Sequence, residues 1–143
     1  PDQDVILFLP QGRGDEPVMN THRTDDLAQR TMRNLRTYFA KQTQHRPSAE
    51  MYAALEDIAC TLSDMANGTA ARKVFLSSLD PGVGKTATIS SFVDELLIRT
   101  EHEHIGVLIC VARLDEIRTL VERMAIPREV LAVYNADTEL NAL

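Results

Sequence analysis

The stretch Val74-Phe-Leu-Ser-Ser-Leu-Asp-Pro-Gly-Val-Gly-Lys-Thr86 decides the expected fold. Residues 74–79 form an apolar run of strand length, and 80–84 have the composition of a glycine loop. After the loop, apolar residues recur at helical spacing. They are Ile89, Phe92, Val93, Leu96 and Leu97. The sequence therefore predicts a strand, a glycine loop and a helix in direct succession.

Two further apolar runs follow this unit. Residues 107–112 are expected to form a buried strand, helical spacing over 114–124 predicts a helix that stops before Pro127, and 130–134 are expected to form a third short strand. Strands that are apolar on both faces and alternate with helices are typical of a parallel sheet covered by helices. The expected fold class is therefore α/β.

Two helices are expected before the α/β segment. The first begins after Thr24, a suitable N-cap, and the second lies between Ser48 and Gly68. Together they predict a small helical hairpin. The expected organisation is an N-terminal strand and loop over 1–20, the hairpin over 21–68 and the α/β segment over 69–143.

The glycine loop has the residue types that phosphate binding requires. Glycines let successive backbone N–H groups turn toward phosphate oxygens, and the positive end of the following helix adds to the same field. Lys85 is expected to bind the β- and γ-phosphates as the catalytic residue, and the Thr86 hydroxyl to bind Mg²⁺. The expected nucleotide-binding residues are Asp80, Pro81, Gly82, Val83, Gly84, Lys85, Thr86 and Ala87. The alternative is a Gly-Lys-Thr at an ordinary strand-to-helix turn.

Leu79-Asp-Pro-Gly-Val-Gly-Lys-Thr86 resembles the P-loop of DEAD/DEAH-type helicases, which has the form Ala-x-x-Gly-x-Gly-Lys-Thr. Its Pro-Gly-x-Gly-Lys-Thr core is also similar to that of AAA+ ATPases. Leu79 is bulkier than the residue that either family uses at this position. The resemblance covers 72–143 and implies the first part of a RecA-like P-loop NTPase sheet with flanking helices. It also implies ATP and Mg²⁺ as cofactors.

The same resemblance implies a nucleic-acid contact. In such helicases the strand after the P-loop helix ends in a short motif that touches the nucleic-acid backbone, and Arg113 holds that position here. The alternative is an arginine that caps the strand end or pairs with Glu116. Hydrolysis would need an acidic pair at the end of a later strand. The pairs Asp94-Glu95 and Asp115-Glu116 fall inside predicted helices. Nucleotide binding without efficient hydrolysis is therefore expected of this chain, as part of a longer ATPase.

Composition sets the remaining expectations. The formal net charge of −6 argues against binding nucleic acid by overall charge, although 22–46 are locally basic. No run is long and apolar enough to span a membrane, and neither a disulfide nor a zinc site is expected of the two cysteines, so a cytoplasmic protein is predicted. The leading functional hypothesis is a helicase-like or translocase-like ATPase acting on nucleic acid. The alternatives are an AAA+ type ATPase acting on a protein or DNA partner, and a non-hydrolysing P-loop interaction module.

Overall fold

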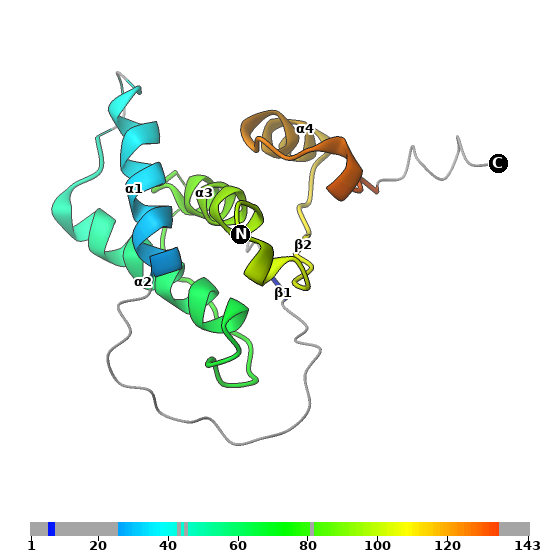
Figure 1. Ribbon diagram of the computed structural model, residues 1–143. Coiled ribbons are helices and arrows are strands. Elements are labelled where there is room, and N and C mark those ends of the chain that lie inside the picture. Colours follow the sequence, from blue (N-terminus) through cyan, green and yellow to red (C-terminus); the bar gives the residue numbers. More distant parts are fainter. Residues whose placement is uncertain (1–5, 8–25, 43, 45, 81, 135–143) are drawn as a thin grey trace.

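The computed structural model describes residues 6–7, 26–42, 44, 46–80 and 82–134, and most of these residues are helical (Figure 1). The α-helices are α1 (Asp26–Ala40), α2 (Ala49–Ala66), α3 (Lys85–Leu97) and α4 (Leu114–Arg123). Two short 3₁₀ segments, η1 (Thr100–His102) and η2 (Arg128–Val130), follow α3 and α4. The strands within the described residues are β1 (Ile6–Leu7) and β2 (Leu108–Ile109).

The predicted RecA-like parallel sheet is wrong. In the described part of the chain, the only strand pairing joins β1 to β2, and it is antiparallel, with Ile6 opposite Ile109 and Leu7 opposite Leu108. Residues 74–79 have no regular secondary structure, and the expected strand at 130–134 begins inside η2 and continues without strand pairing. The fold is therefore mostly helical rather than α/β.

The correction has a physical reason at 74–79. An apolar run becomes a strand only where a neighbouring segment pairs with its backbone, and hydrophobicity alone does not supply that neighbour. Among the described residues, no backbone hydrogen bond joins 74–79 to another extended segment. Val74 and Leu76 are 61% and 76% exposed, and Phe75 between them is 38% exposed, so neither face of this segment is covered. The run is apolar, but it is not a buried strand.

The helices form where the sequence pattern places them. Ser48 is the N-cap of α2 and accepts a hydrogen bond from the Met51 N–H at 3.2 Å, and Gly68 follows its end with a positive φ of 72°. On α3, Phe92 and Leu96 are almost fully buried, whereas Leu97 is exposed. The predicted apolar face of α3 is therefore confirmed except at its last residue.

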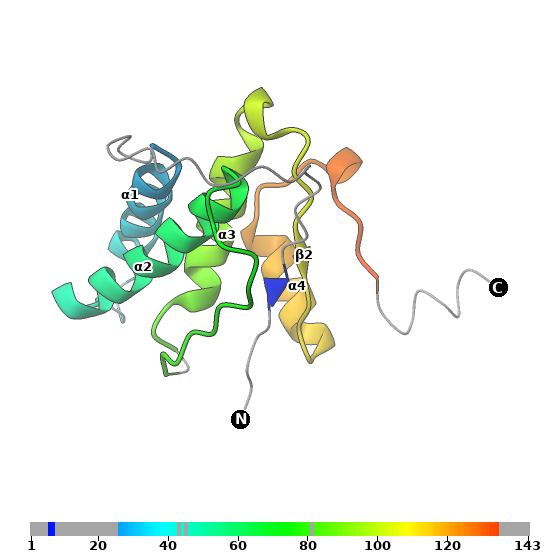
Figure 2. The ribbon, with the colours of Figure 1, turned by 90° about the horizontal axis from the view of Figure 1, so that it is seen from below.

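α3 lies between the pair α1 and α2 and the helix α4, as Figures 1 and 2 both show. One apolar cluster, the first cluster, packs around α3 and contains residues from all four helices and from the residue after α4. Its members are Leu27, Leu62, Ile89, Phe92, Val93, Leu96, Leu120 and Met124. A second cluster joins α1 and α2 to the first turn of α3: Ala28, Met32, Leu35, Phe39, Leu55, Ala59 and Ala87. The helices of 21–68 therefore share their core with α3.

The strand expected at 107–112 was predicted to be buried on both faces, but the segment 105–111 is covered on one face only. Alternate residues of this segment pack against the first cluster: Ile105, Val107, Ile109 and Val111. Leu108, on the opposite face, is 60% exposed. The alternation is that of an extended chain, but only one face is covered.

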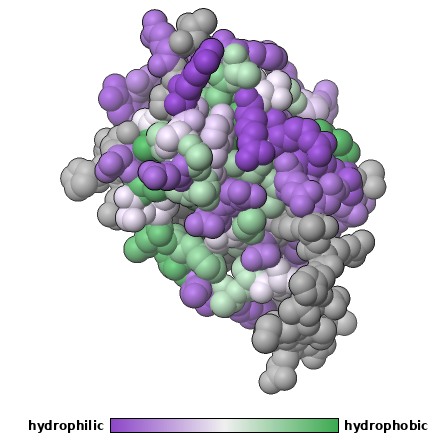
Figure 3. Space-filling model, turned by 90° about the vertical axis from the view of Figure 1, so that its left-hand side faces the viewer, coloured by the Kyte–Doolittle hydropathy of each residue, from purple (hydrophilic) through white to green (hydrophobic). Residues whose placement is uncertain are grey.

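The outer face of the pair α1 and α2 is polar. Figure 3 views this side of the molecule, and hydrophilic side chains cover most of it. On α1, Arg33 and Arg36 are exposed, whereas Leu35 on the opposite face is fully buried. Among the described residues, no helix combines the length and apolarity that crossing a membrane requires.

Candidate phosphate-binding loop

The glycine loop leads directly into the open end of α3. Gly82 and Gly84 have positive φ values of 82° and 109°, and Gly84 is the N-cap of the helix. Such values favour glycine, because a side chain would crowd the backbone. Gly84 has no side chain with which to cap α3, and the first N–H groups of any helix lack an acceptor within it. This helix end therefore presents backbone donors and a positive dipole, which is the arrangement that binds an anion.

Lys85 is the first residue of α3, and its side chain folds back over the loop. Its ammonium Nζ donates a hydrogen bond to the Leu79 carbonyl oxygen at 2.6 Å. The side chain is half-buried. This carbonyl oxygen is neutral, so a phosphate oxygen reaching the same place would be a stronger partner for the charge.

Thr86 and Ala87 complete the first turn. Thr86 is half-buried, next to Lys85, where a hydroxyl could bind a metal ion held by phosphate oxygens. The turn is braced by hydroxyl groups on α3: Thr88 donates to the Gly84 carbonyl at 2.9 Å, and Ser90 donates to the Thr86 carbonyl at 2.8 Å. Ala87 is buried in the second cluster, so its contribution to a ligand is limited to its backbone.

The structure brings most of the predicted nucleotide-binding residues together. Gly82, Val83, Gly84, Lys85 and Thr86 form one continuous turn, in which Val83 is half-buried. Asp80 is exposed before the turn. The remaining predicted residue, Pro81, lies outside the described residues.

Gly84 also faces the hydrophobic core. A Cβ atom added at Gly84 would lie 2.7 Å from Cζ of Phe39 and 3.3 Å from Cδ1 of Leu55. Phe39 comes from α1 and Leu55 from α2, so both helices of the hairpin form the back of the loop. Sequence reasoning missed this contact. No motif joins residues that are so far apart in the chain, and the spacing of apolar residues predicts only that Phe39 is buried.

Among the described residues, Arg113 has no hydrogen bond or ion pair to the loop. It precedes α4, is 69% exposed, and donates hydrogen bonds to both carboxylate oxygens of Asp115 at 3.2 and 3.1 Å. The pairing partner is thus Asp115 and not Glu116. An exposed pair of this kind contributes at most about 1 kcal/mol. The predicted nucleic-acid contact of Arg113 stays a prediction.

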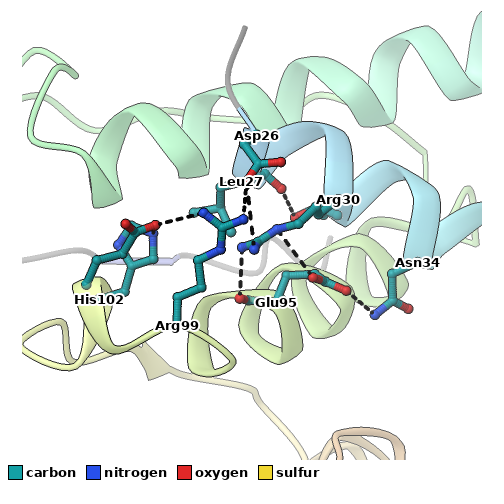
Figure 4. A network of polar contacts seen from close by, with 9 residues as sticks. Asp26, Leu27, Arg30, Asn34, Glu95, Arg99 and His102 are labelled. Atoms are coloured by element: carbon teal, nitrogen blue, oxygen red, sulfur yellow. Dashed lines mark hydrogen bonds and ion pairs between the residues drawn. The ribbon is translucent and has the colours of Figure 1, made fainter. Parts of the chain in front are cut away.

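Glu95, of the acidic pair Asp94-Glu95, has a structural role near the other end of α3 (Figure 4). Glu95 accepts a hydrogen bond from Asn34 at 3.2 Å and lies 3.6 Å from Nε of Arg30, and the side chains of Arg30 and Glu95 are both only 15% exposed. Arg99, just after α3, pairs with Asp26 at the start of α1. These contacts join α1 to α3, and Glu95 is largely buried between the two helices.

Asp94 also binds the chain beyond α4. Its carboxylate accepts a hydrogen bond from the Ala125 N–H at 3.1 Å. Burial raises the pKa of Asp94, the hydrogen bond from Ala125 opposes that rise, and the neighbouring Glu95 adds to it. Among the described residues, no hydrogen bond or ion pair joins this acidic pair to the loop.

In the described chain, no group of three or more His, Cys, Asp or Glu residues could hold a metal ion. Mg²⁺ at this loop would therefore depend on Thr86, on phosphate oxygens and on water, which is a common arrangement for this ion. Comparison with protein-family models, with curated proteins and with solved structures found no match to this chain.

Proposed function

We propose that the loop at 80–87 binds a nucleoside triphosphate, with ATP as the expected nucleotide, together with Mg²⁺. The observation that supports this most is the run from Gly82 through Gly84, both at positive φ, into an uncapped helix end that begins with Lys85. In this proposal, backbone N–H groups, the helix dipole and the Lys85 ammonium act together on the phosphates.

Each residue of the turn has a distinct part in this proposal. The N–H groups of the first turn bind phosphate oxygens, and Lys85 leaves the Leu79 carbonyl to bind the β- and γ-phosphates. Thr86 binds Mg²⁺ through its hydroxyl. The energy for moving Lys85 comes from exchanging a hydrogen bond to a neutral oxygen for one to an anionic oxygen.

The proposal does not depend on a parallel sheet. The anion-binding groups all belong to the turn and to α3, and the support behind Gly84 comes from α1 and α2. The helicase-like or translocase-like action on nucleic acid, driven by bound ATP, is proposed from the sequence resemblance of 79–86. The AAA+ type ATPase and the non-hydrolysing module remain the alternatives.

Calorimetric titration of ATP with Mg²⁺ tests the proposal. The wild-type chain should bind saturably, Lys85→Ala should lose most of the affinity, and Thr86→Ala should lose the dependence on Mg²⁺. Arg118→Ala is the matched control, because it removes one positive charge from an exposed position on α4. Equal binding by the wild type, Lys85→Ala and Arg118→Ala would refute the loop as the nucleotide site.

A further inference from the structure

The ring of Phe39 lies directly behind Gly84. A Cβ atom at Gly84 would be 2.7 Å from Cζ and 3.3 Å from Cε2 of this ring. Real Cβ atoms do not approach other atoms to 2.7 Å, so the ring leaves room for glycine and for nothing larger. We infer that Phe39 is a positioning residue for the phosphate-binding loop, and that it acts by holding Gly84 in its left-handed conformation. This inference rests on the proposed function.

The ring is itself held in place. Phe39 is 5% exposed and belongs to the second cluster. Tyr38 and Tyr52 contact it edge to face, with ring centroids 5.4 and 6.1 Å from that of Phe39 and interplanar angles of 64° and 76°. Tyr52 comes from α2, so the Phe39 ring packs against aromatic side chains from both helices of the hairpin. A ring fixed in this way is a rigid support for the loop.

The neighbours of Tyr38 and Tyr52 extend this packing. The Arg123 guanidinium lies 5.0 Å from the Tyr38 ring centroid and donates a hydrogen bond to the Tyr38 hydroxyl at 2.9 Å. The Arg36 guanidinium lies 5.4 Å from the Tyr52 ring centroid. Residues from α1, α2 and α4 therefore fix the ring that supports Gly84.

The position of Phe39 separates the two sides of the loop. In the proposed site the backbone N–H groups of 84–87 meet the phosphate, whereas the Phe39 ring lies against Gly84 from the hydrophobic core. Without the ring, the glycines could move inward, because glycine adopts many backbone conformations at little energetic cost. The N–H groups would then no longer converge. A supporting residue affects binding in this way without touching the ligand.

The rival explanation is that Phe39 is an ordinary core residue. Leu35 provides the matched control, because it is fully buried in the same cluster and on the same helix, but is not among the three atoms nearest to a Gly84 Cβ. Leu35→Ala should lower the stability of the hairpin without altering the loop. If Phe39 has only a structural role, substitutions of Phe39 should likewise lower stability without altering the loop.

Two variants remove the rigid ring. Phe39→Met keeps most of the buried volume but not its rigidity, and Phe39→Leu serves if Phe39→Met does not fold. ATP with Mg²⁺ is titrated into each variant, into Leu35→Ala and into the wild type, at a temperature where circular dichroism shows each chain to be folded. Phe39→Met, or Phe39→Leu in its place, is called the ring variant. It should bind ATP about tenfold more weakly than the wild type, as expected for a site whose support is loosened. Leu35→Ala should bind within about twofold of the wild type.

Amide hydrogen exchange gives a second readout that needs no ligand. Exchange at Gly82, Gly84 and Lys85 should be faster in the ring variant than in Leu35→Ala. The inference is overturned if the ring variant and Leu35→Ala agree in both affinity and loop exchange. Failure of the proposed function would look different, because Lys85→Ala would then bind ATP as the wild type does. If the wild type binds no ATP, the exchange readout alone decides the positioning role of Phe39.

Discussion

Gly84→Ala is the perturbation that the structure predicts most sharply. Two effects add at this position. A non-glycine residue in the left-handed region costs about 1–2 kcal/mol. The new methyl group would meet Phe39 at 2.7 Å and Leu55 at 3.3 Å, and forcing extra volume into a packed core costs about 1–3 kcal/mol. The expected loss in the free energy of unfolding is therefore about 2–5 kcal/mol.

Urea unfolding followed by circular dichroism measures this loss, with Gly68→Ala as the matched control. Gly68 also has a positive φ, of 72°, but a Cβ atom added there meets nothing within 4 Å. Gly68→Ala should therefore show only the backbone cost of about 1–2 kcal/mol. If Gly84→Ala and Gly68→Ala lose the same stability, the close packing of Phe39 behind Gly84 is refuted.

A double-mutant cycle isolates the contact itself. In a chain that already carries Phe39→Leu, the methyl group of Gly84→Ala meets a smaller and more flexible side chain. Part of the packing cost should then disappear, while the backbone cost remains. The expected coupling between the two substitutions is about 1–2 kcal/mol, within the range found for residues in contact. Additive losses would contradict this account.

Three further predictions follow from single side chains. Ser63 is fully buried and its hydroxyl has no hydrogen-bond partner among the described residues, so Ser63→Ala should raise the free energy of unfolding by about 1 kcal/mol in urea titrations; a loss of stability would contradict this. The pKa of Asp94 is raised above its ordinary value of 3.8, so its charged form is unfavourable in the folded state and this penalty disappears as the pH falls through the raised pKa. Asp94→Asn keeps an acceptor for the Ala125 N–H and should be more stable than the wild type at pH 7 but not at pH 3, as urea midpoints at the two pH values would show; a less stable variant at pH 7 would count against it. Arg113→Ala should leave the Tm unchanged, because its pair with Asp115 is exposed, and should weaken binding of a fluorescent single-stranded oligonucleotide if Arg113 contacts nucleic acid; unchanged anisotropy titrations would remove that role.

The sequence predicted the helices because their signals are local. Ser48 and Gly68 mark the ends of α2 through capping, which involves only neighbouring residues. The apolar stripe on α3 likewise predicts which face is buried. Each of these features depends on a few consecutive residues, so a single chain read without its fold is sufficient to find them.

The sheet could not be predicted in this way because pairing between strands is not local. The runs 74–79, 107–112 and 130–134 are apolar, and apolarity is compatible with a buried strand, a one-faced strand or an exposed extended segment. At 105–111 the structure shows a segment with one covered face, and at 74–76 it shows an exposed segment. Of these runs, the hydrophobic pattern was right about a strand only within 107–112, where β2 forms, because it could not say which backbones lie beside each run.

The contacts between α1 and α3 were missed for a related reason. Asn34 and Arg30 stand one helical turn apart, which places both on one side of α1, and Glu95 is their shared partner. The sequence shows the two donors but not the acceptor that they meet, since the partners are separated by 61 and 65 residues. Long-range polar pairs of this kind become visible only in the fold.

The glycine loop depends on both local and long-range features. Its backbone conformation depends on Gly82 and Gly84 and on a helix that begins at Lys85, all of which are local and were predicted. Its support depends on Phe39, which the sequence shows only as one apolar residue of a helical stripe. A sheet would have supported such a loop through the strand before it, yet here 74–78 are exposed and Leu79 alone packs against the second cluster. The rigidity of the loop must therefore come from the hairpin, so substitutions in α1 should affect phosphate binding more than substitutions at 74–76 do.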